Sequence, residues 1–159
     1  MSNLTSLIDA TEQTLTRIAA DFSPAVFASS LAAEDMVLTD LIVGDKLSIE
    51  IFSLDTGRLP VETYTLMGKV EQHYGTTLKV FFPDATSVET LVRSHGINAF
   101  YDSVELRKAC CGVRKMEPLS RMLAGRTAWV TGLRREQSNA RGEVRTVEAD
   151  DQGRAKINP

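Results

Sequence analysis

The sequence predicts an α/β protein in which helices cover both faces of a mostly parallel, Rossmann-like sheet. Short apolar runs, each about as long as a buried strand, alternate along the chain with longer amphipathic stretches. Such alternation implies right-handed crossovers between parallel strands. The 159 residues contain no linker, repeat or low-complexity tract, so we expect a single domain over residues 1–159.

The first third of the chain predicts a helix, a strand and a second helix. We expect them over residues 4–22, 25–28 and 33–43. Both helices are predicted from apolar residues spaced three and four apart, and the strand is predicted from a short apolar run. Pro24 ends the first helix, because the residue before a proline disfavours the helical conformation, and Gly44 closes the second.

The middle third repeats the alternation. We expect strands over residues 47–54 and 78–82, a helix from Pro60 to Tyr74, and a short helix through residues 88–92. The first strand is rich in β-branched and aromatic residues. Pro60 suits the first turn of its helix, and Thr86 or Ser87 is the expected cap of the short one.

The last third is helical and basic at its start. Residues 101–123 have a helical pattern that we expect to be broken at Gly112 and again at Pro118. Residues 128–131 predict a buried strand. Two weaker strands are expected at 144–147 and 155–157, joined by a turn over 150–153.

Composition limits the class of protein. Apolar residues make up 43% and charged residues 25%, as in ordinary globular proteins, and no run of 18 apolar residues predicts a membrane span. The N-terminal residues lack the basic region of a secretory signal, so we expect a cytoplasmic protein. Two adjacent cysteines do not form a disulfide framework.

The net charge of −3 conceals an uneven distribution. Residues 1–106 carry 6 basic and 15 acidic side chains, whereas residues 107–145 carry 10 basic and 3 acidic ones. A cationic segment on an acidic body indicates a local anionic partner, with a solvated basic face as the alternative. No aromatic residues are interleaved with the basic ones, so a nucleic-acid surface is not expected.

Three polar loops follow predicted strands: Ser29–Ser30, Asp55–Gly57 and Gly132–Gln137. In open parallel sheets such loops meet beyond the carboxyl ends of the strands, where ligands bind. Hydroxyl groups at a helix N-terminus and two arginines suit phosphate or sulfate oxygens. The convergence predicts a nucleotide-like ligand, although many serine-containing turns hold none.

These loops resemble motifs of the sulfonucleotide reductases. Ser29–Asp35 (SSLAAED) resembles their modified phosphate loop, Leu54–Arg58 their LDTG motif, Gly132–Ser138 their arginine loop and Lys156–Pro159 their KINP segment. Cys110 and Cys111, followed by Arg114 and Lys115, resemble the paired cysteines of the iron–sulfur branch, adenylyl-sulfate reductase. The motifs stand in the expected order from about residue 22 to the last residue.

The resemblance implies the adenine-nucleotide alpha-hydrolase (PP-loop) fold. Related ATP-pyrophosphatase proteins share this fold but carry an SGGxDS loop. Here Leu31, Ala32 and Ala33 interrupt that pattern. This departure favours a reductase over an adenylating enzyme, which would release pyrophosphate from ATP.

The implied activity is the thioredoxin-dependent reduction of adenosine 5′-phosphosulfate to sulfite and AMP, in sulfate assimilation and cysteine biosynthesis. The resemblance also implies the residues that bind the substrate. Ser29 and Ser30 would hold the phosphosulfate or nucleotide, Asp55 and Gly57 would line the nucleoside pocket, Lys115 would contact the phosphosulfate, and Arg134, Arg135 and Arg141 would belong to a mobile arginine loop.

Two alternatives stay open. One is a phosphoadenylyl-sulfate (PAPS) reductase, although paired cysteines usually accompany the unphosphorylated substrate in this family. The other is a non-catalytic adenine-nucleotide-binding fragment.

Cys110 and Cys111 are implied ligands of a 4Fe-4S cluster, which needs four thiolates. In the family a later CxxC pair completes the set and a cysteine near the C-terminus is the nucleophile. This sequence contains neither, so we expect a piece of a longer reductase rather than a degenerate homologue. The alternative for the pair is two small buried residues on a helix. Expected partners are thioredoxin or a similar dithiol and a second copy of the chain.

Overall fold

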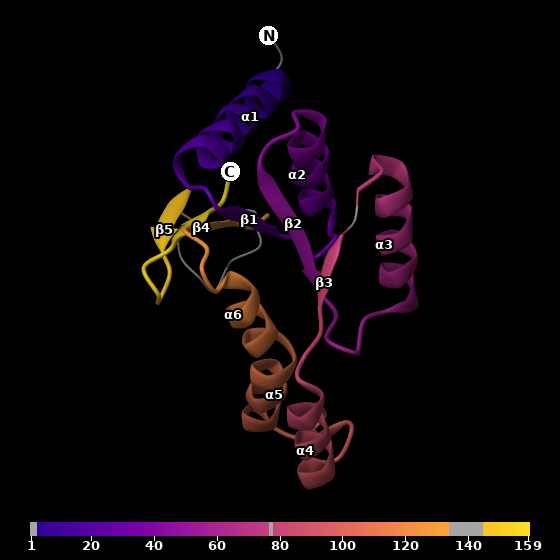
Figure 1. The fold of residues 1–159 in the computed structure, drawn as a ribbon. Helices are drawn as coiled ribbons and strands as arrows, with labels where there is room; N and C mark the ends of the chain where they lie inside the picture. Colours follow the sequence, from indigo (N-terminus) through magenta and orange to yellow (C-terminus); the bar gives the residue numbers. More distant parts are fainter. Residues whose placement is uncertain (1–2, 77, 134–144) are drawn as a thin grey trace.

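The fold is a six-stranded sheet with helices on both faces, as the computed structural model shows for residues 3–76, 78–133 and 145–159 (Figure 1). The strands are β1 (Ala25–Ala28), β2 (Ile49–Leu54), β3 (Lys79–Phe81), β4 (Ala128–Val130), β5 (Val147–Ala149) and β6 (Ala155–Ile157). Their order is β3-β2-β1-β4-β6-β5, and every pair is parallel except β5 with β6. The predicted mostly parallel sheet is confirmed.

The helices connect these strands. They are α1 (Asn3–Asp21), α2 (Ala33–Gly44), α3 (Val61–Tyr74), α4 (Ala85–His95), α5 (Val104–Cys111) and α6 (Glu117–Leu123). A 3-10 turn spans Ala99–Tyr101, and a π-helical turn spans Gly112–Met116 between α5 and α6. No helix in the described ranges is long and apolar enough to cross a membrane.

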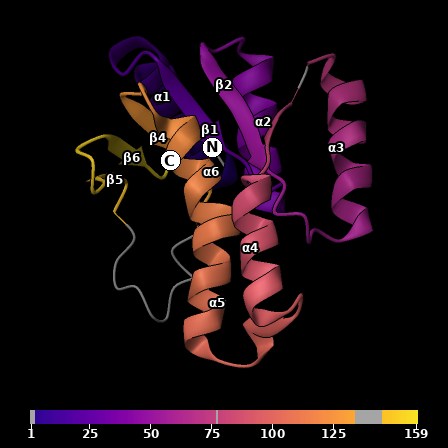
Figure 2. The ribbon, with the colours of Figure 1, turned by 60° about the horizontal axis from the view of Figure 1, so that its bottom comes forward.

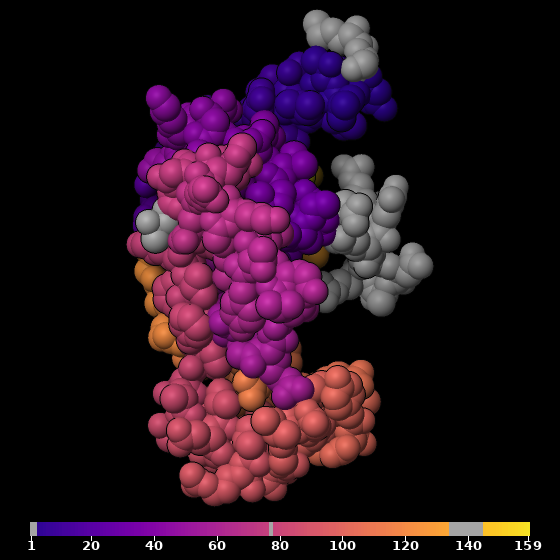
Figure 3. All heavy atoms as spheres, turned by 90° about the vertical axis from the view of Figure 1, so that its right-hand side faces the viewer, coloured from indigo at the N-terminus to yellow at the C-terminus, as the bar shows by residue number. Residues whose placement is uncertain are grey.

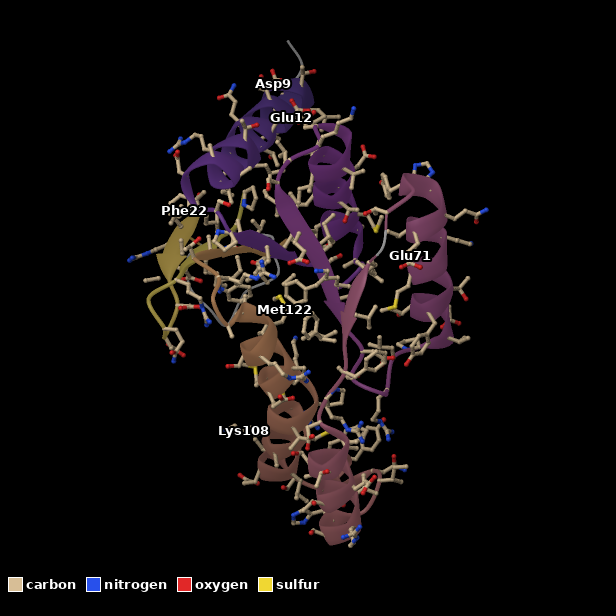
Figure 4. The ribbon with its side chains drawn as sticks, viewed as in Figure 1. Asp9, Glu12, Phe22, Glu71, Lys108 and Met122 are labelled. Atoms are coloured by element: carbon tan, nitrogen blue, oxygen red, sulfur yellow. The ribbon has the colours of Figure 1, made fainter. Side chains whose placement is uncertain are left out.

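Alternating side chains of β1 build the two layers of the core. Phe27 is fully buried with residues of α1 and α2 on one face, whereas Val26 packs on the other face against Met122 of α6. Figure 4 shows Met122 at the end of α6 that lies nearest the sheet. The helix α3 covers the β2 and β3 side of the first face through Met67 and Val70.

The helices α4 and α5 lie side by side and project from the sheet as an arm (Figures 2 and 3). The helix α5, the π turn and α6 follow one another without a gap, so the predicted breaks at Gly112 and Pro118 are wrong. Gly112 keeps a right-handed helical conformation. Pro118 would clash with the carbonyl group four residues earlier in a regular α-helix, and the π turn widens the backbone there.

Other predicted boundaries shift by a few residues. The helix α4 is capped by Asp84 rather than Thr86 or Ser87, since the Asp84 carboxylate accepts hydrogen bonds from the Ser87 N–H and hydroxyl, both at 2.8 Å. The hydroxyl bond lowers the pKa of Asp84. The fifth strand begins at Val147 instead of residue 144, which lies outside the described residues, and the sixth agrees with the prediction.

Candidate nucleotide-binding site

A cavity of about 540 Å³ lies at the carboxyl ends of the strands. It opens where β1 and β4 are neighbours, although the chain runs from β1 to β2 and β3 on one side before returning to β4 on the other. Such a reversal of strand order is where open α/β sheets bind ligands. The volume is that of a small-molecule pocket.

Most of the lining comes from four parts of the chain. They are the loop after β1 with the start of α2, the end of β2 with its loop, the end of β4 with Gly132 and Leu133, and the wall formed by the π turn and α6; Thr63 of α3 and Lys156 of β6 complete it. Phe52, Leu54, Leu119 and Trp129 make one part of the lining apolar, while serine, threonine, lysine and acidic side chains supply the polar part.

The loop after β1 is held by a carboxylate of the chain itself. Ser30 donates from its N–H and from its hydroxyl to Oδ2 of Asp35, both at 2.6 Å, and Asp35 is only 4% exposed. The hydroxyl of buried Ser29 accepts from the Leu31 N–H at 3.2 Å. Both predicted serines therefore line the cavity, but the donors of Ser30 already bond to an internal anion.

Asp35 also brings the loop after β4 against the loop after β1. A Cβ atom at Gly132 would overlap Oδ1 of Asp35 and crowd the side chain of Glu34. Any residue larger than glycine at position 132 would displace the carboxylate. The preceding residue, Thr131, directly follows β4 and bonds through its hydroxyl to the Asn158 side chain, which ties the end of β4 to the segment after β6.

The loop after β2 is shaped by Asp55. Its buried carboxylate accepts from the Gly57 N–H at 2.7 Å and from the Tyr64 hydroxyl at 2.9 Å, and the latter bond raises the pKa of Tyr64. Gly57 has a positive φ of 69°, which glycine adopts readily. Asp55 and Gly57 thus organise the loop, while Thr56 between them lines the cavity.

Two lysines line the cavity from different elements. Lys115 comes from the π turn and Lys156 from β6. The ammonium group of Lys156 bonds to Glu148 at 2.5 Å, which lowers the pKa of that carboxyl group, and lies 5.7 Å from the centre of the Trp129 ring. The acidic residues of the lining, Glu34 and Asp35, are at the start of α2.

The cysteine pair lies next to the wall of the cavity. Cys110 is half-buried and Cys111 exposed at the end of α5, and both are free thiols. The alternative of two small buried residues is therefore wrong for Cys111, while Cys110 is only partly buried. In the described residues no three His, Cys, Asp or Glu side chains gather as a metal site. Two adjacent accessible thiols fit half of the ligand set of a four-iron cluster.

The predicted arginine loop is only partly described. Gly132 and Leu133 line the cavity at its start. Arg134, Arg135 and Arg141 lie outside the described residues. Of the predicted binding residues, the structure brings Ser29, Ser30 and Lys115 to one cavity and places Asp55 and Gly57 behind it.

Comparison with known proteins assigns the family. The family model of the phosphoadenosine phosphosulfate reductase domain matches residues 24–159. The chain belongs to this sulfonucleotide reductase family. The matched region includes β1 and every loop that lines the cavity.

Curated relatives are about half identical in sequence. The chain is 51% identical over 146 residues to an adenosine 5′-phosphosulfate reductase of Allochromatium vinosum, covering 91% of this chain and 57% of the relative. It is 54% identical over 134 residues to one of Burkholderia cepacia, covering 84% and 54%. One of Neisseria meningitidis is 51% identical over 160 residues, covering 98% and 66%. The chain thus spans between about half and two thirds of these relatives.

A solved structure confirms the fold. The crystal structure of phosphoadenylyl-sulfate (PAPS) reductase from Candida auris, a phosphate complex, aligns with a TM-score of 0.73. The alignment covers 100% of this chain and 79% of the other, at 22% sequence identity. The predicted Rossmann-like α/β class, in its PAPS reductase form, is confirmed.

Sequence reasoning missed several residues of the site. Asp35 carries a visible signal, an acid in the first turn of a helix, but its contacts with Ser30 and Gly132 depend on the fold. Lys156 belongs to the segment that resembles the KINP motif, but the sequence predicts no contact between this lysine and a ligand. Trp129, in a strand predicted to be buried, packs against the core beside Val26 and Met122, and it also lines the cavity.

Proposed function

We propose that this chain is the substrate-binding part of a reductase that converts adenosine 5′-phosphosulfate to sulfite and AMP. One observation carries the proposal: in a chain of this family, the loops after β1, β2 and β4 and a lysine-bearing wall line a single cavity of nucleotide size. The names of the relatives that are about 50% identical support the substrate.

The lining suggests how a sulfonucleotide would be held. Phe52, Leu54 and Leu119 offer an apolar surface for a purine, while Lys115 and Lys156 offer positive charge for phosphate and sulfate oxygens. Positive charge at this place also stabilises the phosphate that departs when the sulfur is attacked. We propose that Ser29, Ser30, Asp55, Gly57 and the three arginines Arg134, Arg135 and Arg141 contribute to the same site.

We further propose that Cys110 and Cys111 would hold part of a 4Fe-4S cluster in the whole protein. Their accessibility and free state support this assignment. Thioredoxin or a similar dithiol is the proposed reductant, and free thiols suit the reducing cytoplasm.

Reduction of PAPS is the second candidate, because the Candida auris protein that shares this fold is a PAPS reductase. The sequence identities argue against it: the 22% identity to that protein is far below the 51% identity to an adenosine 5′-phosphosulfate reductase.

Calorimetry with this chain tests the binding part of the proposal. We expect AMP to bind and adenosine 3′,5′-bisphosphate to bind more weakly, because the latter carries the additional phosphate. Absence of heat and of thermal protection at millimolar AMP would contradict a nucleotide site. Tighter binding of the bisphosphate would favour PAPS.

Turnover is tested in the complete protein. We expect it to release sulfite from adenosine 5′-phosphosulfate with thioredoxin as the reductant. Binding of AMP without sulfite release would leave the non-catalytic nucleotide-binding protein as the better description.

A further inference from the structure

Arg114 joins the wall of the cavity to the loop after β2. It lies in the π turn, and its Nη1 atom donates to the Thr56 carbonyl oxygen at 2.8 Å, across 58 positions of sequence. The contact is partly buried. Thr56 itself lines the cavity, as does Lys115, the residue that follows Arg114.

We propose that Arg114 is a positioning residue, which sets where the wall, with Lys115 and the cysteine pair, lies relative to the sulfonucleotide. This inference rests on the proposed function. Arg114 does not line the cavity, so its effect on a ligand would pass through Thr56 and the wall. In the π turn, the Arg114 side chain contacts the loop after β2, whereas the neighbouring Lys115 side chain lines the cavity.

Gly57 makes the contact possible. A Cβ atom built at this position would lie 3.2 Å from Nη1 of Arg114, closer than side chains ordinarily pack. Asp55 holds the same loop from the other side through the Gly57 N–H. The hydrogen bond from Gly57 to Asp55 therefore holds the Thr56 carbonyl in place, and the Arg114 guanidinium group donates to this carbonyl.

A second arginine fastens the loop to the arm. Arg58 donates to the Ile97 carbonyl at 3.1 Å and to Oδ1 of Asn98 at 2.9 Å, and its guanidinium group lies 4.6 Å from the centre of the Phe100 ring. These partners belong to the connection between α4 and α5. Arg58 thus anchors the arm through this connection, whereas Arg114 anchors the segment that carries Lys115.

The experiment compares Arg114→Met with Lys115→Met for two ligands, AMP and adenosine. A positioning residue changes the shape of the cavity, so Arg114→Met should weaken both ligands, roughly 2- to 30-fold. Lys115→Met removes charge, so it should weaken AMP far more than adenosine. Arg114→Lys should restore part of the affinity, because an ammonium group can still donate to the carbonyl.

Arg107→Met is the matched control, since Arg107 is an exposed arginine of α5 whose side chain donates to the Phe100 carbonyl oxygen rather than to the loop after β2. It should leave both affinities unchanged. Unaltered binding in Arg114→Met would overturn the inference. A selective loss of AMP in that variant, with unchanged amide exchange in the loop after β2, would also overturn it, because it would show a direct contact with the phosphate.

Hydrogen exchange provides a readout that does not depend on the proposed function. The amides of Gly57 and Arg58 are bonded to Asp55 and to the Thr56 hydroxyl within the loop. Arg114→Met should accelerate their exchange, and Arg107→Met should not. If the unmodified chain binds neither AMP nor adenosine, the proposed function fails while faster exchange still supports the role of Arg114. Unchanged exchange would overturn that role.

Discussion

The loops after β1 and β2 are both held by an aspartate carboxylate, but the two carboxylates make different further contacts. In each, an aspartate carboxylate accepts a hydrogen bond from a backbone N–H of the loop: Asp35, in the first turn of α2, accepts from Ser30, and Asp55 accepts from Gly57. Asp35 also takes the Ser30 hydroxyl and lies against Gly132, so it closes its loop onto the loop after β4. In the loop after β2, the carbonyl of Thr56, the neighbour of Asp55, instead accepts a hydrogen bond from Arg114.

The difference separates two ways of building one cavity. The first loop is fixed by Asp35 of α2, which also lies against the loop after β4, whereas the second is fixed by its own Asp55 and by Arg114 of the π turn. Substitutions at the first should therefore disturb the folded body as well as the ligand. Substitutions at the second should mainly disturb the placement of the wall.

The largest effect is expected from Gly132→Ala. The added methyl group would overlap the buried Asp35 carboxylate, and overpacking of this kind costs about 1–3 kcal/mol. Urea denaturation should show this loss of stability together with loss of AMP binding. Gly68→Ala, at a helical position with open space around it, is the control and should not destabilise the chain.

Asp35→Ala should come next. It removes two hydrogen bonds to a carboxylate, and Ser30 is exposed enough for water to replace them in part, so we expect a loss of about 2 kcal/mol by urea denaturation. Asp35→Asn keeps an acceptor oxygen and should lose less. Equal losses in the two variants would contradict the role given to the hydrogen bonds.

Asp55→Asn should have a smaller effect on stability, about 1 kcal/mol, because the amide oxygen can still accept from Gly57 or Tyr64. Its effect on AMP affinity should exceed its effect on unfolding, since this loop carries Thr56 at the cavity. A variant that unfolds as easily as Asp35→Ala would remove the distinction between the two loops.

The smallest effect is a titration. The hydrogen bond to Asp55 raises the pKa of Tyr64 above 10, so its stabilising contribution is complete below pH 10 and is lost as the pH rises through the raised pKa. Asp55→Asn removes the negative charge and should bring the ionisation of Tyr64 back toward pH 10. Ultraviolet absorbance of tyrosinate, with Tyr64→Phe to identify the signal, measures the change.

Much of the fold followed from local patterns. The strand at residues 25–28 and the strand at 155–157 have the predicted bounds, and the helix expected over 33–43 ends one residue later. These segments are short apolar runs or amphipathic stretches whose limits are marked by proline, glycine or a polar turn. The convergence of three loops followed from the alternation of strands and helices, which predicts a parallel sheet with its post-strand loops at one edge.

The errors arose where the fold overrides a local rule. Gly112 and Pro118 predict breaks by propensity, but a π turn between two helices accommodates them. Asp35 meets Gly132 only because β1 and β4 are neighbours, and no periodicity in the sequence announces that pairing. The contact of Arg114 with Thr56 joins residues 58 positions apart, and no local pattern in the sequence predicts it.

The π turn determines how the cysteine pair at the end of α5 is oriented relative to Lys115. Each residue of an α-helix turns the chain by about 100°, and a residue added to or removed from the π turn between Cys111 and Lys115 would likewise rotate the thiols around the helix axis relative to Lys115. The number of residues in this interval is therefore under geometric constraint even where their identities are free. A designer who grafts this wall onto another protein would have to copy its length first and its composition second.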